Sequence, residues 1–268
     1  MENKKINSEK IVQHIVSWLK DYTENARVKG FVVGISGGID SALVSTLCAK
    51  TGLPTLCLEM PIHQAESHVS RAQEHIKFLK DNYSNVTSAV ADLTSTFDLM
   101  AEQFPKGDNE QRLHLTLANT RARLRMTTLY YYAGINQLLV AGTGNKVEDF
   151  GVGFYTKYGD GGVDISPIAD LMKSEVRALA NYLGVTQTII KAKPTDGLFG
   201  DDRSDEDQLG ANYDELEAAM VANEQGKTEG DFSGRELEVF KIYKRLNTIN
   251  QHKMNPIPVC IISNEIKY

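Results

Sequence analysis

The sequence is poor in cysteine, has no long apolar run and carries no block of positive charge. Its three cysteines, Cys48, Cys57 and Cys260, lie in apolar segments and lack the spacing of metal ligands. We therefore expect reduced, buried thiols in a cytoplasmic protein, without a disulfide framework or a zinc site. The apolar runs are too short to span a membrane, and no apolar segment typical of a signal peptide follows Met1. The net charge of −6 and the lack of a basic run argue against a nucleic-acid partner.

The composition that is present is that of an ordinary globular protein. The chain has 268 residues, of which 41% are hydrophobic and 24% are charged. That length can bury a large core, and no repeat or linker divides the sequence, so we expect a single domain over 1–268. The segment 196–210 is acidic and punctuated by glycines. It is either a solvated surface loop or a mobile lid over a site.

Short apolar runs alternate with helical patterns along most of the chain. The runs that predict strands are 31–35, 55–60, 86–91, 137–141 and 163–165. The patterns that predict helices include an N-terminal stripe from Ile11 to Leu19 and the segments 64–80, 108–133, 173–183, 213–223 and 234–248. This alternation predicts an α/β fold, a Rossmann-like parallel five-stranded sheet with helices on both faces. In such sheets, ligands bind beyond the carboxyl ends of the strands.

The first predicted strand runs directly into the sequence Ser36-Gly37-Gly38-Ile39-Asp40-Ser41, and a helical stretch follows. A strand, a two-glycine turn and a helix start place backbone N–H groups and the positive end of a helix dipole together, which favours a phosphate. No lysine precedes Ser41, so the loop is not of the Walker type. Asp40 offers a carboxylate that can hold Mg²⁺ beside the phosphates. The alternative is a glycine-rich turn that serves packing alone.

Three further segments carry groups suited to anionic ligands. Residues 119–126 place Arg121 and Arg125 on one helix face and Arg123 on another. They either line a solvated face or meet an anion. Residues 142–149 follow a predicted strand and offer a hydroxyl, a lysine and carboxylates, and residues 153–164 combine glycines, aromatics, a lysine and carboxylates.

Together these segments resemble the ammonia-dependent NAD⁺ synthetases of the N-type ATP pyrophosphatase superfamily. The resemblance extends from Phe31 to Lys253, and its most specific stretches are 34–41, 122–126 and 154–162. It implies an adenine nucleotide alpha hydrolase-like fold and a homodimer. The reaction implied is the amidation of deamido-NAD with ammonia and ATP, through an adenylate, to give NAD⁺, AMP and pyrophosphate. A chain of this length has no room for a glutaminase domain, so we expect free ammonia as the nitrogen donor.

The resemblance also implies roles for individual residues. The ATP-binding residues would be Gly34, Ile35, Ser36, Gly37, Gly38, Ile39, Asp40, Ser41, Thr143, Lys173 and Thr195. The deamido-NAD-binding residues would be Arg123, Lys157, Asp160, Asp164, His252 and Lys253. Asp40 and Glu148 would share Mg²⁺, with Asp149 as the rival to Glu148. The catalytic residues would be Asp160, Lys173 and Asp40. Lys173 would stabilise charge on the phosphates during the reaction, and Asp40 would act through the Mg²⁺ that it holds. Asp160 is our candidate for the group that captures ammonium or accepts its proton.

The sequence departs from the family after Thr143, where it reads Gly144-Asn145-Lys146-Val147-Glu148. Many members have an acidic residue and a histidine there. Two other functions stay open at this stage. One is another N-type ATP pyrophosphatase, either an adenylating amidating enzyme or a thiolase, and the other is a non-catalytic nucleotide-binding protein. In the family the loop corresponding to 196–210 orders over ATP, which favours the lid over the surface loop.

Overall fold

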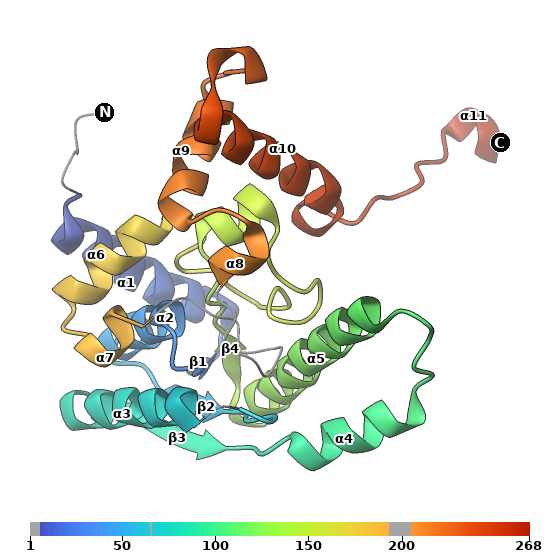
Figure 1. Cartoon of the computed structure of the whole chain (residues 1–268). Coiled ribbons are helices and arrows are strands. Elements are labelled where there is room, and N and C mark those ends of the chain that lie inside the picture. Colours follow the sequence, from blue (N-terminus) through green and yellow to red (C-terminus); the bar gives the residue numbers. More distant parts are fainter. Residues whose placement is uncertain (1–5, 65, 193–204) are drawn as a thin grey trace.

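The sheet is parallel and lies at the centre of a computed structural model that describes residues 6–64, 66–192 and 205–268. Its strands are β1 (Gly30–Gly34), β2 (Thr55–Glu59), β3 (Val86–Val90) and β4 (Leu138–Val140), in the order β3-β2-β1-β4. Figure 1 shows the strands running side by side, with helices in front of and behind them. The predicted α/β class is thereby confirmed.

The prediction of a fifth strand at 163–165 is wrong, because the sheet has four strands in the described part of the chain. Ile165 makes only an isolated parallel bridge with Ala141. The residue before it explains why the ladder stops. The Asp164 side chain accepts a hydrogen bond from the backbone N–H of Val140 at 2.8 Å and so takes the place of a strand carbonyl.

Alternating side chains of β1 build two separate layers of core. Phe31 and Val33 face a cluster formed with α1 (Ser8–Ala26), α2 (Ile39–Lys50), α3 (Glu66–Asn82) and α6 (Lys173–Tyr182), whereas Val32 faces α5 (Glu110–Asn136). This period of two is the expected consequence of strand geometry. Helices therefore cover both faces of the sheet, as the sequence predicted.

The remaining elements complete the chain. They are α4 (Thr94–Gln103), the π-helical turn η1 (Val147–Val152), α7 (Gln187–Ile190), α8 (Asp205–Leu209), α9 (Tyr213–Glu224), the 3₁₀ turn η2 (Glu229–Asp231), α10 (Gly234–Met254) and α11 (Asn264–Lys267). A further apolar cluster joins η1, α9 and α10, and Figure 1 shows α9 and α10 above the sheet.

The predicted lid, 196–210, falls mostly outside the described residues and stays a prediction. Of that segment the structure describes 205–210, which holds α8.

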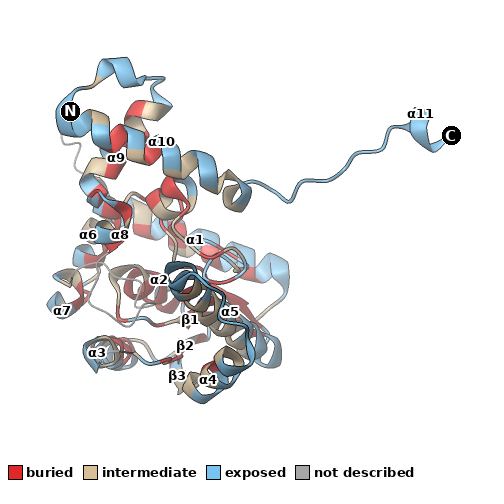
Figure 2. Cartoon of the chain, turned by 45° about the vertical axis from the view of Figure 1, so that its right-hand side comes forward, coloured by how far each residue is buried: buried red, intermediate tan, exposed pale blue. Residues whose placement is uncertain are grey.

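The C-terminal segment differs from the sequence prediction in two ways. Helix α10 continues to Met254, past the break expected after residue 248, because Asn247 and Asn250 donate hydrogen bonds to the carbonyls of Gly151 and Val152. After α10 the chain stands away from the body (Figure 2). Cys260 is therefore exposed, contrary to the prediction of a buried thiol, while Cys48 and Cys57 are buried as expected.

A buried histidine makes the stability of this fold sensitive to acid. The His75 side chain is fully buried, and its Nε2 lies 2.9 Å from Oγ of Ser45. Burial lowers the pKa of His75 to about 4. Between the ordinary pKa near 6.5 and that value, the unfolded chain binds a proton that the folded chain refuses, so stability falls as the pH falls.

We expect the free energy of unfolding to decrease by about 2 kcal/mol from this group alone between pH 7 and pH 5. The measurement is urea unfolding at both pH values for the unchanged protein and for His75→Gln. The variant should lose that part of the pH dependence. His14, exposed on α1, gives the control substitution His14→Gln. If His75→Gln kept the full pH dependence, the assignment to His75 would be wrong.

Candidate active site

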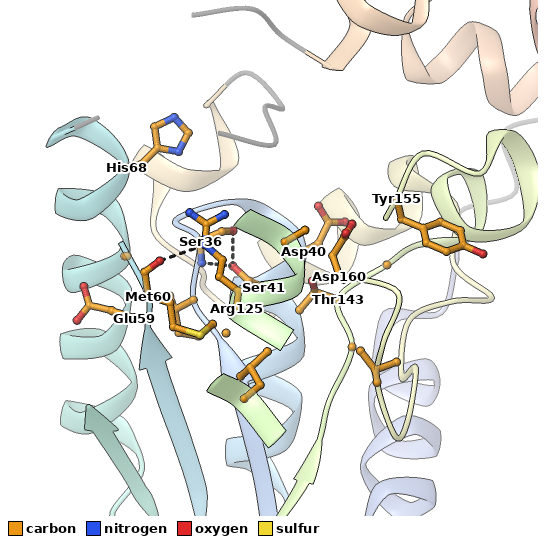
Figure 3. Close-up of a pocket in the computed structure, with 18 of the residues that line it drawn as sticks. Ser36, Asp40, Ser41, Glu59, Met60, His68, Arg125, Thr143, Tyr155 and Asp160 are labelled. Atoms are coloured by element: carbon orange, nitrogen blue, oxygen red, sulfur yellow. Dashed lines mark hydrogen bonds between the residues drawn. The ribbon is translucent and has the colours of Figure 1, made fainter. Parts of the chain in front are cut away.

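The loop between β1 and α2 is shaped to receive an anion. Gly37 has a φ of +79°, and Gly38 is the N-cap residue of α2, where no side chain caps the first N–H groups of the helix. Ser41 braces the turn, because its Oγ donates to the carbonyl of Gly38 at 3.0 Å and accepts from the backbone N–H of Ser36 at 3.3 Å. Figure 3 shows both serines side by side at the mouth of the turn. Uncapped N–H groups at a helix start are an anion-binding arrangement.

A buried lysine joins the two predicted metal ligands. Nζ of Lys173 lies 2.6 Å from Oδ2 of Asp40 and 3.0 Å from Oε1 of Glu148, and its side chain is only 3% exposed. Burial alone would lower the pKa of Lys173, but the two carboxylates outweigh it and raise that pKa above the ordinary value. The structure thus brings together three residues that the sequence places in separate segments. They form a charged centre beside the phosphate loop.

Neighbouring groups hold this centre in place. Nδ2 of Asn145 donates to Oδ1 of Asp40 at 3.1 Å, and the hydroxyl of Tyr213 donates to Oε1 of Glu148 at 2.6 Å. Asp149 lies next to Glu148, and its pKa rises to about 8 through burial and the charges of Glu148, Asp160 and Asp40. The site therefore holds more carboxylates than one lysine neutralises.

Two cavities, each of about 300 Å³, meet at this edge of the sheet. The first lies against the phosphate loop, the end of β2 and Thr143. The second lies between residues 155–161 and the end of α10. Their common wall consists of Gly142, Gly144, Asp149, Tyr155, Asp160 and Val163. A ligand in either cavity would therefore reach the same few side chains, including the Asp160 carboxylate seen between Asp40 and Tyr155 in Figure 3.

Lysines attach the end of α10 to the segment that forms the second cavity. Nζ of Lys253 donates to the carbonyls of Gly153 and Tyr155, both at 2.8 Å. Nζ of Lys157 donates to the carbonyl of His252. Asp160 accepts a 2.9 Å hydrogen bond from the backbone N–H of Thr156, which orients its carboxylate. Lys157, Asp160 and Lys253 all line the second cavity.

Other predicted ligand residues lie elsewhere. In the described structure, neither cavity is lined by Arg123, Asp164 or His252. Arg123 donates to the carbonyl of Lys157 at 3.3 Å. The Asp164 carboxylate accepts hydrogen bonds from the Tyr130 hydroxyl at 2.9 Å and from Val140. Thr195 lies outside the described residues, so its predicted contact with ATP stays a prediction.

Arg125 is the main residue of the first cavity that sequence reasoning did not assign. Its Nε donates to the carbonyl of Met60 at 3.1 Å and its guanidinium to Oε1 of Gln64 at 2.8 Å. The helical spacing explains its direction. Ala118 and Ala122 are buried, and Arg125 lies on the same face of α5, three residues after Ala122. That face directs Arg125, rather than Arg123, toward the cavity.

Gly144, in the segment that follows β4, lies directly against the Asp149 side chain. A Cβ at Gly144 would collide with the Asp149 carboxylate. Glycine is therefore needed for Asp149 to approach the backbone so closely.

In the described part of the chain there is no group of three or more His, Cys, Asp or Glu side chains placed to hold a metal. Nor do the described helices include one long and apolar enough to cross a membrane.

Comparisons with known proteins show the family of the chain. The family model for NAD synthase matches residues 11–256. An NH(3)-dependent NAD(+) synthetase of Carboxydothermus hydrogenoformans is 33% identical over 255 residues, or 93% of this chain and 96% of that protein. The NMN synthetase structure from Francisella tularensis superposes with a TM-score of 0.82 at 30% identity, over 97% of this chain and 100% of that one. The NH3-dependent NAD synthetase of Campylobacter jejuni, in complex with nitrate, gives 0.77 at 26% identity, over 96% and 100%. The chain belongs to the NAD synthase family.

Proposed function

We propose that this protein amidates deamido-NAD with ammonia and ATP, giving NAD⁺, AMP and pyrophosphate. The observation that carries the proposal is the pair of cavities that share one wall, one of them built on an uncapped phosphate loop. Because the cavities share a wall, ATP in the first cavity can bring its α-phosphorus next to the carboxylate of a second ligand in the other cavity. Membership of the NAD synthase family supplies the reaction.

The chemistry needs positioning more than a protein nucleophile. A carboxylate is a poor electrophile, so the nicotinate carboxylate must first be activated. One of its oxygens attacks the α-phosphorus of ATP. The bond from the α-phosphorus to the oxygen that bridges the α- and β-phosphates breaks, and its electron pair leaves with pyrophosphate. Ammonia then attacks the acyl carbon, AMP leaves, and a proton is released. Backbone N–H groups of the loop and Lys173 stabilise the charge on the phosphates.

We propose Asp40 and Glu148 as the residues that would hold Mg²⁺. They fit that role because Mg²⁺ is commonly bound by one or two carboxylates together with substrate phosphates. The geometry supports it as well, because Asp40 and Glu148 share a single lysine and a cation would offset their remaining negative charge. When bound, Mg²⁺ would offset negative charge on the phosphates.

Asp160 is proposed to capture ammonium or accept its proton, because it lies in the wall common to both cavities. Asp160→Asn keeps the size of the side chain and removes the charge. We expect kcat at saturating ammonium to fall about 10²-fold or more. The steady-state rate of NAD⁺ formation measures this. Unimpaired turnover of the variant would remove Asp160 from the reaction.

A second substrate is suggested by a structural relative. The Francisella tularensis protein is an NMN synthetase, and it is similar over nearly the whole length of both chains. The same adenylation and amidation applied to the nicotinate mononucleotide would give NMN. Equal amounts of the two acids, supplied with ATP, Mg²⁺ and ammonium, compete directly for the site. NAD⁺ as the main product supports the dinucleotide, and NMN as the main product supports the mononucleotide.

We also propose that the chain forms a homodimer. Several large apolar side chains are exposed, among them Tyr131 and Ile135 on α5 and Ile257, Val259 and Ile261 after α10. A second copy would cover such residues. Sedimentation analysis at micromolar concentration distinguishes a dimer from a monomer.

The test of the proposed reaction is a product analysis. Incubation with ATP, Mg²⁺, deamido-NAD and ammonium should yield NAD⁺ and AMP in equal amounts. Formation of ADP in place of AMP would contradict the adenylation, and no product from either acid substrate would contradict the amidation.

A further inference from the structure

Tyr213 is the first residue of α9, and its side chain is fully buried. A capping box fixes the start of this helix. Oδ1 of Asn212 accepts a hydrogen bond from the backbone N–H of Glu215 at 2.9 Å, and Oε2 of Glu215 accepts one from the backbone N–H of Asn212 at 3.0 Å. The Tyr213 ring belongs to the apolar cluster that joins η1, α9 and α10. The position of Tyr213 is therefore fixed without any ligand.

Tyr213 contacts both members of one ion pair in the charged centre. Its hydroxyl donates to Oε1 of Glu148 at 2.6 Å, and Nζ of Lys173 lies over its ring, 4.6 Å from the centroid. An aromatic face attracts a cation at that distance. Lys173 donates to the same oxygen of Glu148, Oε1, at 3.0 Å. Two donors, one from α6 and one from α9, thus meet at one oxygen of this carboxylate.

The other oxygen of the Glu148 carboxylate is left for a further partner. Among the described residues, no group donates a hydrogen bond to Oε2 of Glu148. The terminal torsion of a glutamate side chain is soft, so its own rotamer preference does not decide which oxygen meets which partner. The two donors decide it instead. They hold Oε1, and Oε2 stays available to a cation.

Lys173 alone would not fix this orientation. An ammonium group is a compact charge with three rotatable donors, so it can bond to either oxygen of a carboxylate or to both. A phenol has a single proton, and here it sits on a buried ring at a capped helix start. Its distance of 2.6 Å to Glu148 is that of a strong hydrogen bond to a charged acceptor. Tyr213 is therefore the directional partner of the carboxylate.

We infer that Tyr213 is a positioning residue for the amidation, because its hydroxyl holds one oxygen of Glu148 and leaves the other for the divalent cation that accompanies ATP. The inference rests on the proposed function and deepens its metal site. Groups that orient a metal ligand in this way commonly contribute about tenfold to a hundredfold to metal affinity or activity. Without the hydroxyl, Lys173 could bond to both oxygens of Glu148 and compete with the cation.

A structural role of the same hydroxyl has to be separated from this one. The hydroxyl also lies 3.4 Å from Oδ2 of Asp205, at the start of α8. A phenol donates one proton and so serves one carboxylate at a time, and the shorter distance favours Glu148. A role through Asp205 would only attach α8 to α9. The two roles predict different results when Glu148 is changed.

The experiment is calorimetric titration of the full chain with ATP, once with Mn²⁺ as the divalent probe and once with a chelator in place of the metal. Tyr213→Phe keeps the buried ring beside Lys173 and removes only the hydroxyl. We expect it to weaken the binding of ATP with Mn²⁺ about tenfold or more and to leave the metal-free affinity unchanged. NAD⁺ formation by this variant should need about tenfold more Mg²⁺ for its half-maximal rate.

Tyr243 supplies the matched control. It lies on α10, is buried and belongs to the same apolar cluster as Tyr213. Tyr243→Phe also removes one hydroxyl from a buried ring. It should match the unchanged protein in both titrations and in its Mg²⁺ requirement.

A double variant shows whether Tyr213 acts through Glu148. Adding Tyr213→Phe to Glu148→Gln should weaken the binding of ATP with Mn²⁺ no further, because the carboxylate that the hydroxyl orients is already gone. A further loss in the double variant would overturn the inference, since the hydroxyl would then act through Asp205 or through packing. Equal affinities of Tyr213→Phe and the unchanged protein for ATP with Mn²⁺ would overturn it as well. So would a parallel loss of the metal-free affinity.

The calorimetric titrations do not need turnover. ATP binding that is independent of Mn²⁺ in the unchanged protein would contradict the proposed metal site and, with it, the role of Tyr213. Failure of the proposed reaction, by contrast, would be seen in the product analysis and would leave the titrations interpretable.

Discussion

Replacing Lys173 with methionine should lower turnover about 10²–10³-fold and destabilise the fold by about 3–5 kcal/mol. Lys173 is 2% exposed, and its ammonium group contacts the carboxylates of Asp40 and Glu148. Methionine keeps the length of the side chain and removes the charge. Two partly buried carboxylates would then face each other without a cation, and the phosphates would lose one stabilising charge.

A surface pair provides the matched control. Lys77 and Asp81 are also 2.6 Å apart, but their side chains are 76% and 58% exposed. Lys77→Met should change the free energy of unfolding by no more than about 0.5 kcal/mol and leave the rate unchanged. Urea unfolding and the rate of NAD⁺ formation measure both variants. Similarly small changes in stability and rate in the two variants would contradict the claim that the buried position of Lys173 makes its ion pairs important.

The second large effect is expected at Gly37, which has a φ of +79°. A Cβ there would lie 2.5 Å from the backbone carbonyl oxygen of His68, which cannot move aside without moving α3. Gly37→Ala therefore adds a steric clash to the backbone strain. We expect a loss of about 2–5 kcal/mol in stability and at least about a tenfold loss in ATP affinity.

Gly52 separates those two contributions. It has the same φ of +79°, but a Cβ there would meet nothing within 4 Å. Gly52→Ala should therefore cost about 1–2 kcal/mol from backbone strain alone and leave ATP binding intact. Urea unfolding and calorimetric titration with ATP give both quantities. Equal ATP affinities in the two alanine variants would contradict the proposed role of the loop.

Local patterns predicted the parts of the fold that local rules determine. The alternation in β1 and the glycine turn at Gly37 follow from strand periodicity and from backbone conformation. The fifth strand was wrong because the Asp164 side chain replaces a strand carbonyl, which is a contact between segments distant in sequence. The extension of α10 was missed for the same reason, since Asn247 and Asn250 bond to η1.

The site was predicted in part, and the reason differs between residues. Asp40 was predicted from the glycine loop itself, whereas Glu148 and Lys173 came from the resemblance to a family, and spacing alone could not have joined the three. Arg125 was predicted to lie on a helix face that is either solvated or meets an anion, but it was given no ligand role; the structure places it in the lining of the first cavity. A small cavity of about 90 Å³ behind the loop, lined by Arg71 of α3 and Arg177 of α6, depends on how these helices pack around α2, which no single segment of sequence encodes.

The most direct measurement follows an oxygen atom through the reaction. Deamido-NAD labelled with ¹⁸O in the nicotinate carboxylate is incubated with ATP, Mg²⁺ and ammonium, and the products are analysed by mass spectrometry. Attack of the carboxylate on the α-phosphorus transfers one labelled oxygen to AMP, so we predict label in AMP and none in pyrophosphate. Unlabelled AMP, or label in inorganic phosphate with formation of ADP, would contradict an adenylate at this site.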